Sequence, residues 1–187
     1  MTVEIVRPAE EHLASYVSAL RSGWSPDNVR PEVAQEELAR IAADPAQFLA
    51  ELEDRNPSGR VVALPDGSTV PRLPGYRRWI WDGEFCGSIG FRWQPGTAEL
   101  PPTCLGHIGY SIVPWKRRNG YATRALALLL PDAKREGLLY VEITTDADNL
   151  ASQRVIEANG GQLVERFQKP AAYGATPPGL RYRIPLL

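Results

Sequence analysis

The stretch HIGYSIVPWKRRNGYATRALALLL, residues 107–130, decides the fold because it joins a strand-like segment to a helix-like segment through a short basic loop. The strand-like part is HIGYSIVP, residues 107–114, and the helix-like part is TRALALLL, residues 123–130. Between them, RRNGYAT fits the spacing Arg/Gln-x-x-Gly-x-Gly/Ala, whose fixed places are taken by Arg117, Gly120 and Ala122. This order predicts a loop that leads from a strand into the N-terminus of a helix.

A loop of this kind is suited to holding a phosphate. The first backbone N–H groups of a helix have no acceptor within the helix, and the helix dipole favours negative charge at the same end. Gly120 and Ala122 lack bulk, so a ligand can approach the main chain closely. An ordinary strand–helix connection is the alternative for the heptapeptide taken by itself.

A second stretch, NLASQRVIEANGG at residues 149–161, favours the phosphate interpretation. Together the two stretches resemble the Gcn5-related N-acetyltransferases (GNAT), which bind acetyl-CoA. The first matches their pyrophosphate loop, and the second matches their next cofactor motif, an Asn-x-x-Ser helix that ends in Asn-Gly. The resemblance is closest to the ribosomal-protein alanine acetyltransferase branch and to a group of predicted acetyltransferases with a Gly-His-Ile-Gly-Tyr-Ser strand. It covers residues 85–187, and the first 84 residues contribute little to it.

The order of elements predicts a single α/β (α+β) domain over residues 1–187, with a hairpin or loop insertion at 55–76. We expect strands at 3–8, 77–81, 85–93, 105–113, 139–145, 162–168 and 181–185, and helices at 8–20, 31–43, 45–54, 120–135 and 149–159. Pro131 predicts a kink or a break into two helices. The resemblance implies a central mixed, partly parallel sheet of about six or seven strands, flanked by helices and splayed where two strands hold the acetyl-CoA arm.

Composition is that of an ordinary globular protein, with 43% apolar and 23% charged residues and a net charge of −1. This charge gives no argument for nucleic acid or for an anionic membrane. No apolar stretch approaches the ~20 residues of a membrane span, and the start MTVEIVRPAEEHL does not have the pattern of a signal peptide. Cys86 and Cys104 have no metal-binding spacing and are interpreted as reduced thiols, with a disulfide bridge as the less favoured alternative. We expect a cytoplasmic monomer or homodimer without metal, nucleic-acid or membrane partners.

The resemblance assigns roles to the main chain on both sides of the loop. Groups near Ile112 and Val113 would bind the pantetheine arm like an added strand, and an N–H there would polarise the thioester carbonyl. Backbone N–H groups from Arg118 to Thr123 would hold the pyrophosphate, and the Arg117 and Arg118 side chains could reach phosphates. The expected cofactor-binding residues are Ile112, Val113, Arg117, Arg118, Asn119, Gly120, Tyr121, Ala122, Thr123, Asn149 and Ser152.

The residues Asn149 and Ser152 each have a structural and a functional interpretation. Asn149 occupies the place of a helix N-cap, where Asn is favoured, and the resemblance adds a cofactor contact. By resemblance to the ribosomal-protein branch, Ser152 would protonate the leaving CoA thiolate; otherwise it is a surface hydroxyl. Many relatives in the superfamily use a Tyr four residues later, where this chain has Ile156, which favours Ser152 as the acid.

Two residues are candidates for the general base, and two for the acceptor site. Glu142 lies in the apolar strand YVEITTD, where burial would raise its pKa, and an ion pair with an Arg is the alternative. His107 has an ordinary pKa near neutrality, and a structural histidine is the alternative. Tyr110 and Trp24 would line the acceptor site or fill the core.

The resemblance therefore implies an acetyl-CoA-dependent N-acetyltransferase that transfers the acetyl group directly to a primary amine. The acceptor would be a protein N-terminus, a lysine or a small-molecule amine. The alternative is a non-catalytic sensor that binds acyl-CoA, because the Tyr is missing and the base is unidentified. Nucleic-acid binding through the run Lys116–Arg118 is a third, weaker interpretation.

Overall fold

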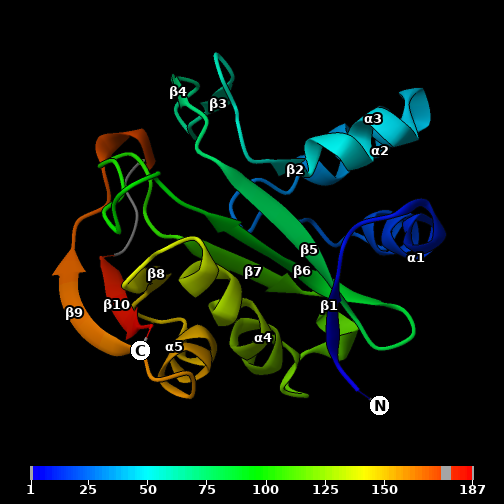
Figure 1. The fold of residues 1–187 in the computed structure, drawn as a ribbon. Helices are drawn as coiled ribbons and strands as arrows, with labels where there is room; N and C mark the ends of the chain where they lie inside the picture. Colours follow the sequence, from blue (N-terminus) through cyan, green and yellow to red (C-terminus); the bar gives the residue numbers. More distant parts are fainter. Residues whose placement is uncertain (1, 174–177, 187) are drawn as a thin grey trace. The chain divides into compact units, whose positions relative to one another are not determined.

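The structure is a computed structural model that describes residues 2–173 and 178–186 (Figure 1). The chain forms two compact units, which are described separately below. Unit 1 consists of Met1–Asp54, Gly75–Gly90 and Tyr110–Leu128, and unit 2 consists of Arg55–Pro74, Phe91–Gly109 and Leu129–Leu187. Within the residues described, none of the helices has the length and apolar character that a membrane span requires.

The elements follow the chain in the order strand, helices, strands, helix, strand, helix, strands. The first half comprises β1 (Glu4–Val6), α1 (Glu10–Arg21), α2 (Val33–Ala43), α3 (Pro45–Glu51), β2 (Glu53–Asp54), β3 (Val61–Ala63), β4 (Thr69–Pro71), β5 (Gly75–Trp81) and β6 (Phe85–Arg92). The second half comprises β7 (Ile108–Ile112), the 3-10 helix η1 (Pro114–Lys116), α4 (Tyr121–Arg135), β8 (Tyr140–Asp146), α5 (Leu150–Glu157), β9 (Gln162–Phe167), the 3-10 helix η2 (Ala171–Tyr173) and β10 (Gly179–Pro185).

The mixed α/β class expected from the sequence is confirmed, and the strands are distributed over three sheets. One has the order β1-β5-β6-β7, with β2 also paired to β5; the second has the order β8-β10-β9; and β3 pairs with β4. The registers of β1–β5, β2–β5, β3–β4, β8–β10 and β9–β10 are all antiparallel. The expected parallel pairing after the crossover is reduced to a main-chain bond from His107 N to Glu142 O at 2.8 Å. Glu142 N donates to the side chain of His107 at 2.9 Å.

Local sequence signals placed most elements correctly. The Asp66-Gly67 and Asp82-Gly83 turns separate β3 from β4 and β5 from β6, as turn-forming pairs of this kind predict. Of the two expectations for Pro131, the break into two helices was wrong, because α4 continues through it, and the kink stays a prediction. Pro131 and Ala127 are both exposed, so water can bond the Ala127 carbonyl that the proline leaves without a donor.

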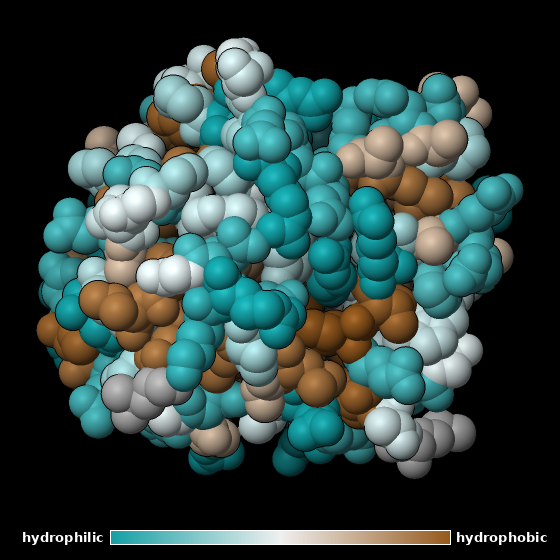
Figure 2. Space-filling view, in the orientation of Figure 1, coloured by the Kyte–Doolittle hydropathy of each residue, from teal (hydrophilic) through white to brown (hydrophobic). Residues whose placement is uncertain are grey.

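The core of unit 1 is an aromatic cluster between α1, α2, α3 and the sheet. Tyr16 stacks on Trp79 with ring centroids 4.4 Å apart, and Phe48 and Phe85 pack around the pair. A buried charge lies beside this cluster, because Glu37 accepts a hydrogen bond from the Tyr16 hydroxyl and pairs with Arg77 at 2.8 Å. Figure 2 shows that, on the face in view, apolar residues gather in several patches with hydrophilic residues between the patches.

The loop that follows β7 is anchored to the β5–β6 turn by a charged cluster within unit 1. Asp82, whose side chain is 2% exposed, binds Lys116 Nζ at 3.0 Å and accepts a hydrogen bond from the Tyr121 hydroxyl. Lys116 also pairs with Glu84 at 2.7 Å. Burial raises the pKa of the Asp82 carboxyl, but the bonds from Tyr121 and Lys116 outweigh burial and hold that pKa at about 2. The cluster therefore holds η1 and the first turn of α4 against the turn.

Cys86 lies next to this cluster and is buried. Burial raises its pKa to about 12, and the Asp82 carboxylate adds to the increase. Cys86 and Cys104 are both free, as expected from the sequence, and no disulfide joins them.

Gly87 lets β6 and β7 approach closely at the point where β7 ends. A Cβ atom at Gly87, whose φ is +154°, would lie 2.3 Å from the Ser111 carbonyl oxygen and 2.9 Å from Ile112 Cα. Both neighbours are main-chain atoms and cannot move independently of the strand. Only glycine fits at this position without displacing the end of β7.

Gly87→Ala should therefore destabilise the protein by about 2 kcal/mol or more, because the new methyl group overlaps the backbone of β7. Urea unfolding measures the change. Gly96→Ala is the matched control, since Gly96 also has a positive φ but has open space where a Cβ would lie. Gly96→Ala should lower the free energy of unfolding by only ~1 kcal/mol, the strain of an alanine in the left-handed conformation. Equal losses in the two variants would contradict the close approach at Gly87.

The Asp82 cluster should make folding stability depend on acid. The folded pKa of about 2 lies below the ~3.9 of an unfolded aspartate, so the contribution is complete above about pH 4 and is lost as the pH falls toward 2. Asp82→Asn removes the contribution. The difference in unfolding free energy between wild type and Asp82→Asn should be constant from about pH 5 to 8 and should shrink below about pH 4. A difference that does not change with acid would show that the carboxylate contributes nothing.

Candidate cofactor and catalytic residues

The loop between η1 and α4 has the backbone shape of an anion cradle. Arg118 has a φ of 65° and Gly120 a φ of 77°, so two left-handed residues flank Asn119. The side-chain amide nitrogen of Asn119, Nδ2, donates to the carbonyl oxygens of Lys116 and Arg117, both at 3.2 Å. These bonds turn the loop carbonyls toward the Asn119 side chain. A left-handed residue between right-handed or extended ones is the arrangement in which successive N–H groups converge on one side.

The donors at the start of α4 are available for a ligand. Among the described residues, no acceptor is assigned to the backbone N–H groups of residues 118–122, and the first bond of the helix runs from Arg124 N to Gly120 O at 3.0 Å. A Cβ at Gly120 would have nothing within 4 Å, so the space beside the loop is open. Unpaired N–H groups at a helix start favour an anion.

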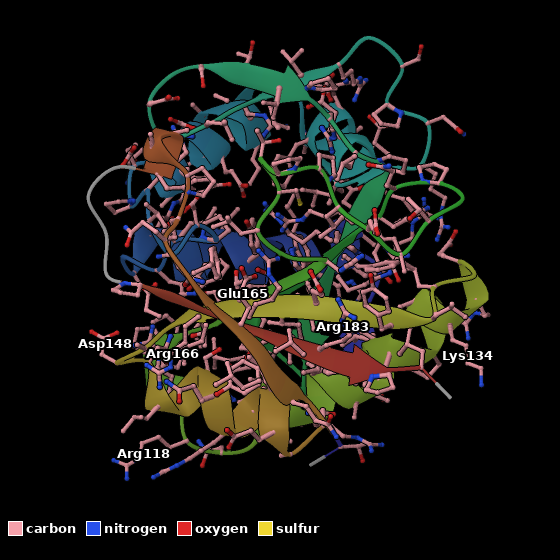
Figure 3. The ribbon with its side chains drawn as sticks, turned by 90° about the vertical axis from the view of Figure 1, so that its left-hand side faces the viewer. Arg118, Lys134, Asp148, Glu165, Arg166 and Arg183 are labelled. Atoms are coloured by element: carbon pink, nitrogen blue, oxygen red, sulfur yellow. The ribbon has the colours of Figure 1, made fainter. Side chains whose placement is uncertain are left out.

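The three basic side chains of the loop have different surroundings. Lys116 is held by Asp82 and Glu84. Arg117 Nε donates to the Ile112 carbonyl oxygen at 3.1 Å. Arg118 is exposed and points away from the ribbon (Figure 3).

The end of β7 distinguishes between its two candidate main-chain donors. Val113 N donates to the Cys86 carbonyl at 3.0 Å, so this N–H is used inside the sheet. Because successive N–H groups of a strand point to opposite edges, the N–H of Ile112 points away from β6. Of these two residues, Ile112 is therefore the one whose N–H group could polarise the thioester carbonyl.

The two candidates for the acceptor site are not brought together. Trp24 is 2% exposed, packs against Tyr16 and Phe85, and donates its Nε1–H to Ser111 Oγ at 3.1 Å. Tyr110 precedes Ser111 in β7, so its side chain lies on the opposite face of the strand. Trp24 therefore has the core role that the sequence left open.

Sequence reasoning missed Asn28, whose amide nitrogen donates to the Tyr110 carbonyl at 3.2 Å. Together with the Trp24–Ser111 bond, this contact ties the segment between α1 and α2 to β7. No spacing in the sequence links residues this far apart, so no local signal could have found the contact.

In unit 2, Glu142 takes part in an ion-pair ladder across three strands. It binds Arg183 Nη2 at 2.7 Å and Arg181 Nη1 at 3.1 Å, and Arg181 Nε binds Glu165 at 2.9 Å. The register explains the ladder, since Arg183 lies opposite Glu142 and Arg181 lies opposite Glu165. Figure 3 shows Arg183 and Glu165 on neighbouring strands. Glu142 thus has the arginine ion pair that was the alternative to a base.

His107 has a structural environment. Its side chain is fully buried, and Nδ1 accepts a hydrogen bond from Glu142 N at 2.9 Å. Burial lowers the pKa of His107 to about 4, so the imidazole is neutral near pH 7 with its proton on Nε2. A base needs a free lone pair, and the only one on this ring is already used.

Helix α5 begins as the sequence predicts. Asn149 is the N-cap, and its side-chain oxygen accepts a hydrogen bond from Ser152 N at 3.1 Å. Ile156 is fully buried, so the position where many superfamily members carry a Tyr faces the core in this chain. Ser152 is half-buried, one turn nearer the helix start. Within the described ranges, no group of three or more His, Cys, Asp or Glu side chains is placed to hold a metal ion.

Comparison with known proteins gives a family for this arrangement. The family profile described as Acetyltransferase (GNAT) domain matches residues 3–162, so the match includes residues 3–84, which carried little of the resemblance. A comparison with curated protein sequences found no match.

Several solved structures share the fold at low sequence identity. RimL, a ribosomal L7/L12 alpha-N-protein acetyltransferase in complex with coenzyme A, has a TM-score of 0.63 and 15% identity, over 99% of this chain and 94% of RimL. The microcin C7 self-immunity acetyltransferase MccE, in complex with acetyl-CoA and AMP, has a TM-score of 0.62 and 15% identity, over 98% and 92% of the two chains. A putative ribosomal-protein-serine acetyltransferase from Vibrio cholerae has a TM-score of 0.60 and 16% identity, over 98% and 93%.

These identities show a shared fold and do not identify an acceptor. The family profile, in contrast, spans most of the sequence and includes both the loop before α4 and the capped start of α5. The chain therefore belongs to the GNAT family of acetyltransferases.

Proposed function

We propose that this protein is a cytoplasmic N-acetyltransferase that transfers the acetyl group of acetyl-CoA directly to a primary amine. The observation that carries the proposal is the loop before α4, where the N–H groups of residues 118–122 have no acceptor among the described residues. Coenzyme A carries a diphosphate, and an anion of that size suits several N–H groups at a helix start. Complexes of RimL with coenzyme A and of MccE with acetyl-CoA, which share the fold, support the choice of donor.

The chemical role proposed for each residue follows from which donors and acceptors are already hydrogen-bonded within the protein. The Ile112 N–H, which points away from β6, polarises the thioester carbonyl and stabilises the oxyanion that forms on attack. Ser152 donates its hydroxyl proton to the sulfur as the carbon–sulfur bond breaks, coenzyme A leaves as the thiol, and Ser152 regains a proton that the amine releases through water. The amine, with an ordinary pKa near ~10, loses its proton to an ordered water relay. Glu142 and His107 hold structure in this scheme, because Glu142 is paired with two arginines and the His107 Nδ1 lone pair accepts the Glu142 N–H.

The acceptor is a primary amine on a protein N-terminus, a lysine or a small molecule. A screen of such amines that detects release of the coenzyme A thiol tests the proposal directly. Thiol release that depends on one class of amine supports the transferase. Tight binding of acetyl-CoA without turnover on any amine would instead favour the second candidate, a sensor that binds acyl-CoA. The buried Ile156 at the position of the missing Tyr is the observation that favours this alternative.

Gly120→Trp should abolish binding of coenzyme A, because the indole fills the open space beside the loop amides. Calorimetry with coenzyme A measures the loss. Gly137→Trp is the matched control, since Gly137 has a φ of +84° and equally open surroundings but lies after α4. The control carries the same backbone strain and should bind normally. Unchanged binding in Gly120→Trp would remove the loop from the cofactor site.

Ser152→Ala should lower turnover by ~10-fold or more while leaving the affinity for acetyl-CoA nearly unchanged, because it removes a proton donor. The helix N-cap should be preserved, since Asn149 accepts its hydrogen bond from the backbone N–H of residue 152. Steady-state thiol release with an amine identified in the screen gives the rate. A wild-type rate in this variant would exclude Ser152 as the acid.

A further inference from the structure

We propose that Arg117 is a positioning residue whose Nε–H group, and not its charge, holds the phosphate loop to the end of β7. The inference rests on the proposed function, because it concerns how the loop and the strand bind one cofactor. Arg117 was expected to reach phosphates with its guanidinium group. Its observed bond is different, since Nε donates to the Ile112 carbonyl oxygen at 3.1 Å.

The bond joins the last residue of β7 to the residue that ends η1. Ile112 is the final residue of the strand, and Arg117 is the C-cap of η1 in an extended conformation, with φ −63° and ψ 160°. The side chain therefore closes a ring around the four intervening residues and fixes the direction in which the loop leaves the strand. The Lys116–Asp82 ion pair and the Asn119 bonds hold the same loop from other directions.

The chemistry of the bond explains why the spacing accepts either Arg or Gln at its first position. The two side chains differ in charge, so a phosphate contact would not treat them as equivalents. They share one feature, an N–H donor at the ε position, the same number of bonds from Cα. That is the atom which contacts Ile112 in this structure. Lysine has the charge of arginine but a methylene group at this position, and its ammonium lies one bond further out.

The position of the bond predicts which ligands it affects. The Ile112 N–H is the proposed contact for the acetyl-bearing arm, and the loop amides are the proposed contact for the diphosphate. A ligand that spans both parts needs them held at a fixed separation, whereas a ligand that contacts only the loop does not. The Ile112 carbonyl oxygen keeps a second lone pair for the arm, because a carbonyl can accept two bonds.

The test compares Arg117→Gln, Arg117→Lys and Arg117→Ala by calorimetry with coenzyme A and with adenosine 3′-phosphate 5′-diphosphate, which keeps the diphosphate but lacks the arm. Arg117→Gln should bind coenzyme A within about twofold of wild type. Arg117→Lys and Arg117→Ala should bind it about tenfold more weakly, as expected for one lost hydrogen bond from a charged group. All three should bind the arm-free nucleotide like wild type. Arg118→Gln, which removes a charge one residue away, serves as the comparison for a purely electrostatic effect.

The salt dependence of coenzyme A affinity is a second measurement, and a structural defect would not change it. The slope of affinity against salt should be the same for Arg117→Gln and wild type if the guanidinium contacts no phosphate. The proposal is overturned if Arg117→Lys binds coenzyme A like wild type while Arg117→Gln is weakened, or if Arg117→Ala has no effect. Equal weakening for both ligands would also overturn it, because the loop itself would then be damaged. A wild-type protein that binds neither ligand would reject the proposed function, an outcome distinct from these.

Discussion

The unpaired main-chain N–H groups at the start of α4 are the constraint on which the proposed chemistry depends. Backbone donors without acceptors are costly unless water or a ligand bonds them, so the loop must be held open by contacts elsewhere. Asp82 supplies one such contact by binding Lys116 and Tyr121 on either side of the loop. Asn119 supplies another, because its side-chain amide donates hydrogen bonds to the carbonyl oxygens of Lys116 and Arg117. The N–H groups of the loop remain available because these side chains bond the groups beside them.

Bonds to neighbouring groups also change the roles of Glu142 and His107, the two candidates for the general base. Glu142 lies in a strand ladder in which each carboxylate is opposite an arginine, and His107 accepts a hydrogen bond from Glu142 N. Both groups are engaged by their neighbours in unit 2 and contribute to the order of the sheet. The proton movements proposed for acetyl transfer are therefore assigned to Ser152 and to water, with the Ile112 N–H stabilising the oxyanion.

Much of the fold and part of the candidate site could be predicted because their signals are local. Hairpin turns at Asp66-Gly67 and Asp82-Gly83, the N-cap at Asn149 and the strand–loop–helix order around Gly120 each depend on neighbouring residues in the chain. Pro131 shows the limit of such rules, since a proline inside a helix is tolerated where the freed carbonyl is exposed. The contacts of Asp82 and Asn28 were missed because their partners are distant in sequence.

The sequence by itself determined the family through a resemblance, and it determined the α/β order of elements and the position of the proposed phosphate loop through short-range spacing and backbone preference. Only the tertiary structure decided what the polar side chains do. Trp24 became part of the core, Glu142 became an ion-pair partner, and Arg117 turned back to Ile112. The physical reason is that a side chain's role depends on which donors, acceptors and charges surround it, and folding brings those groups together from distant parts of the chain.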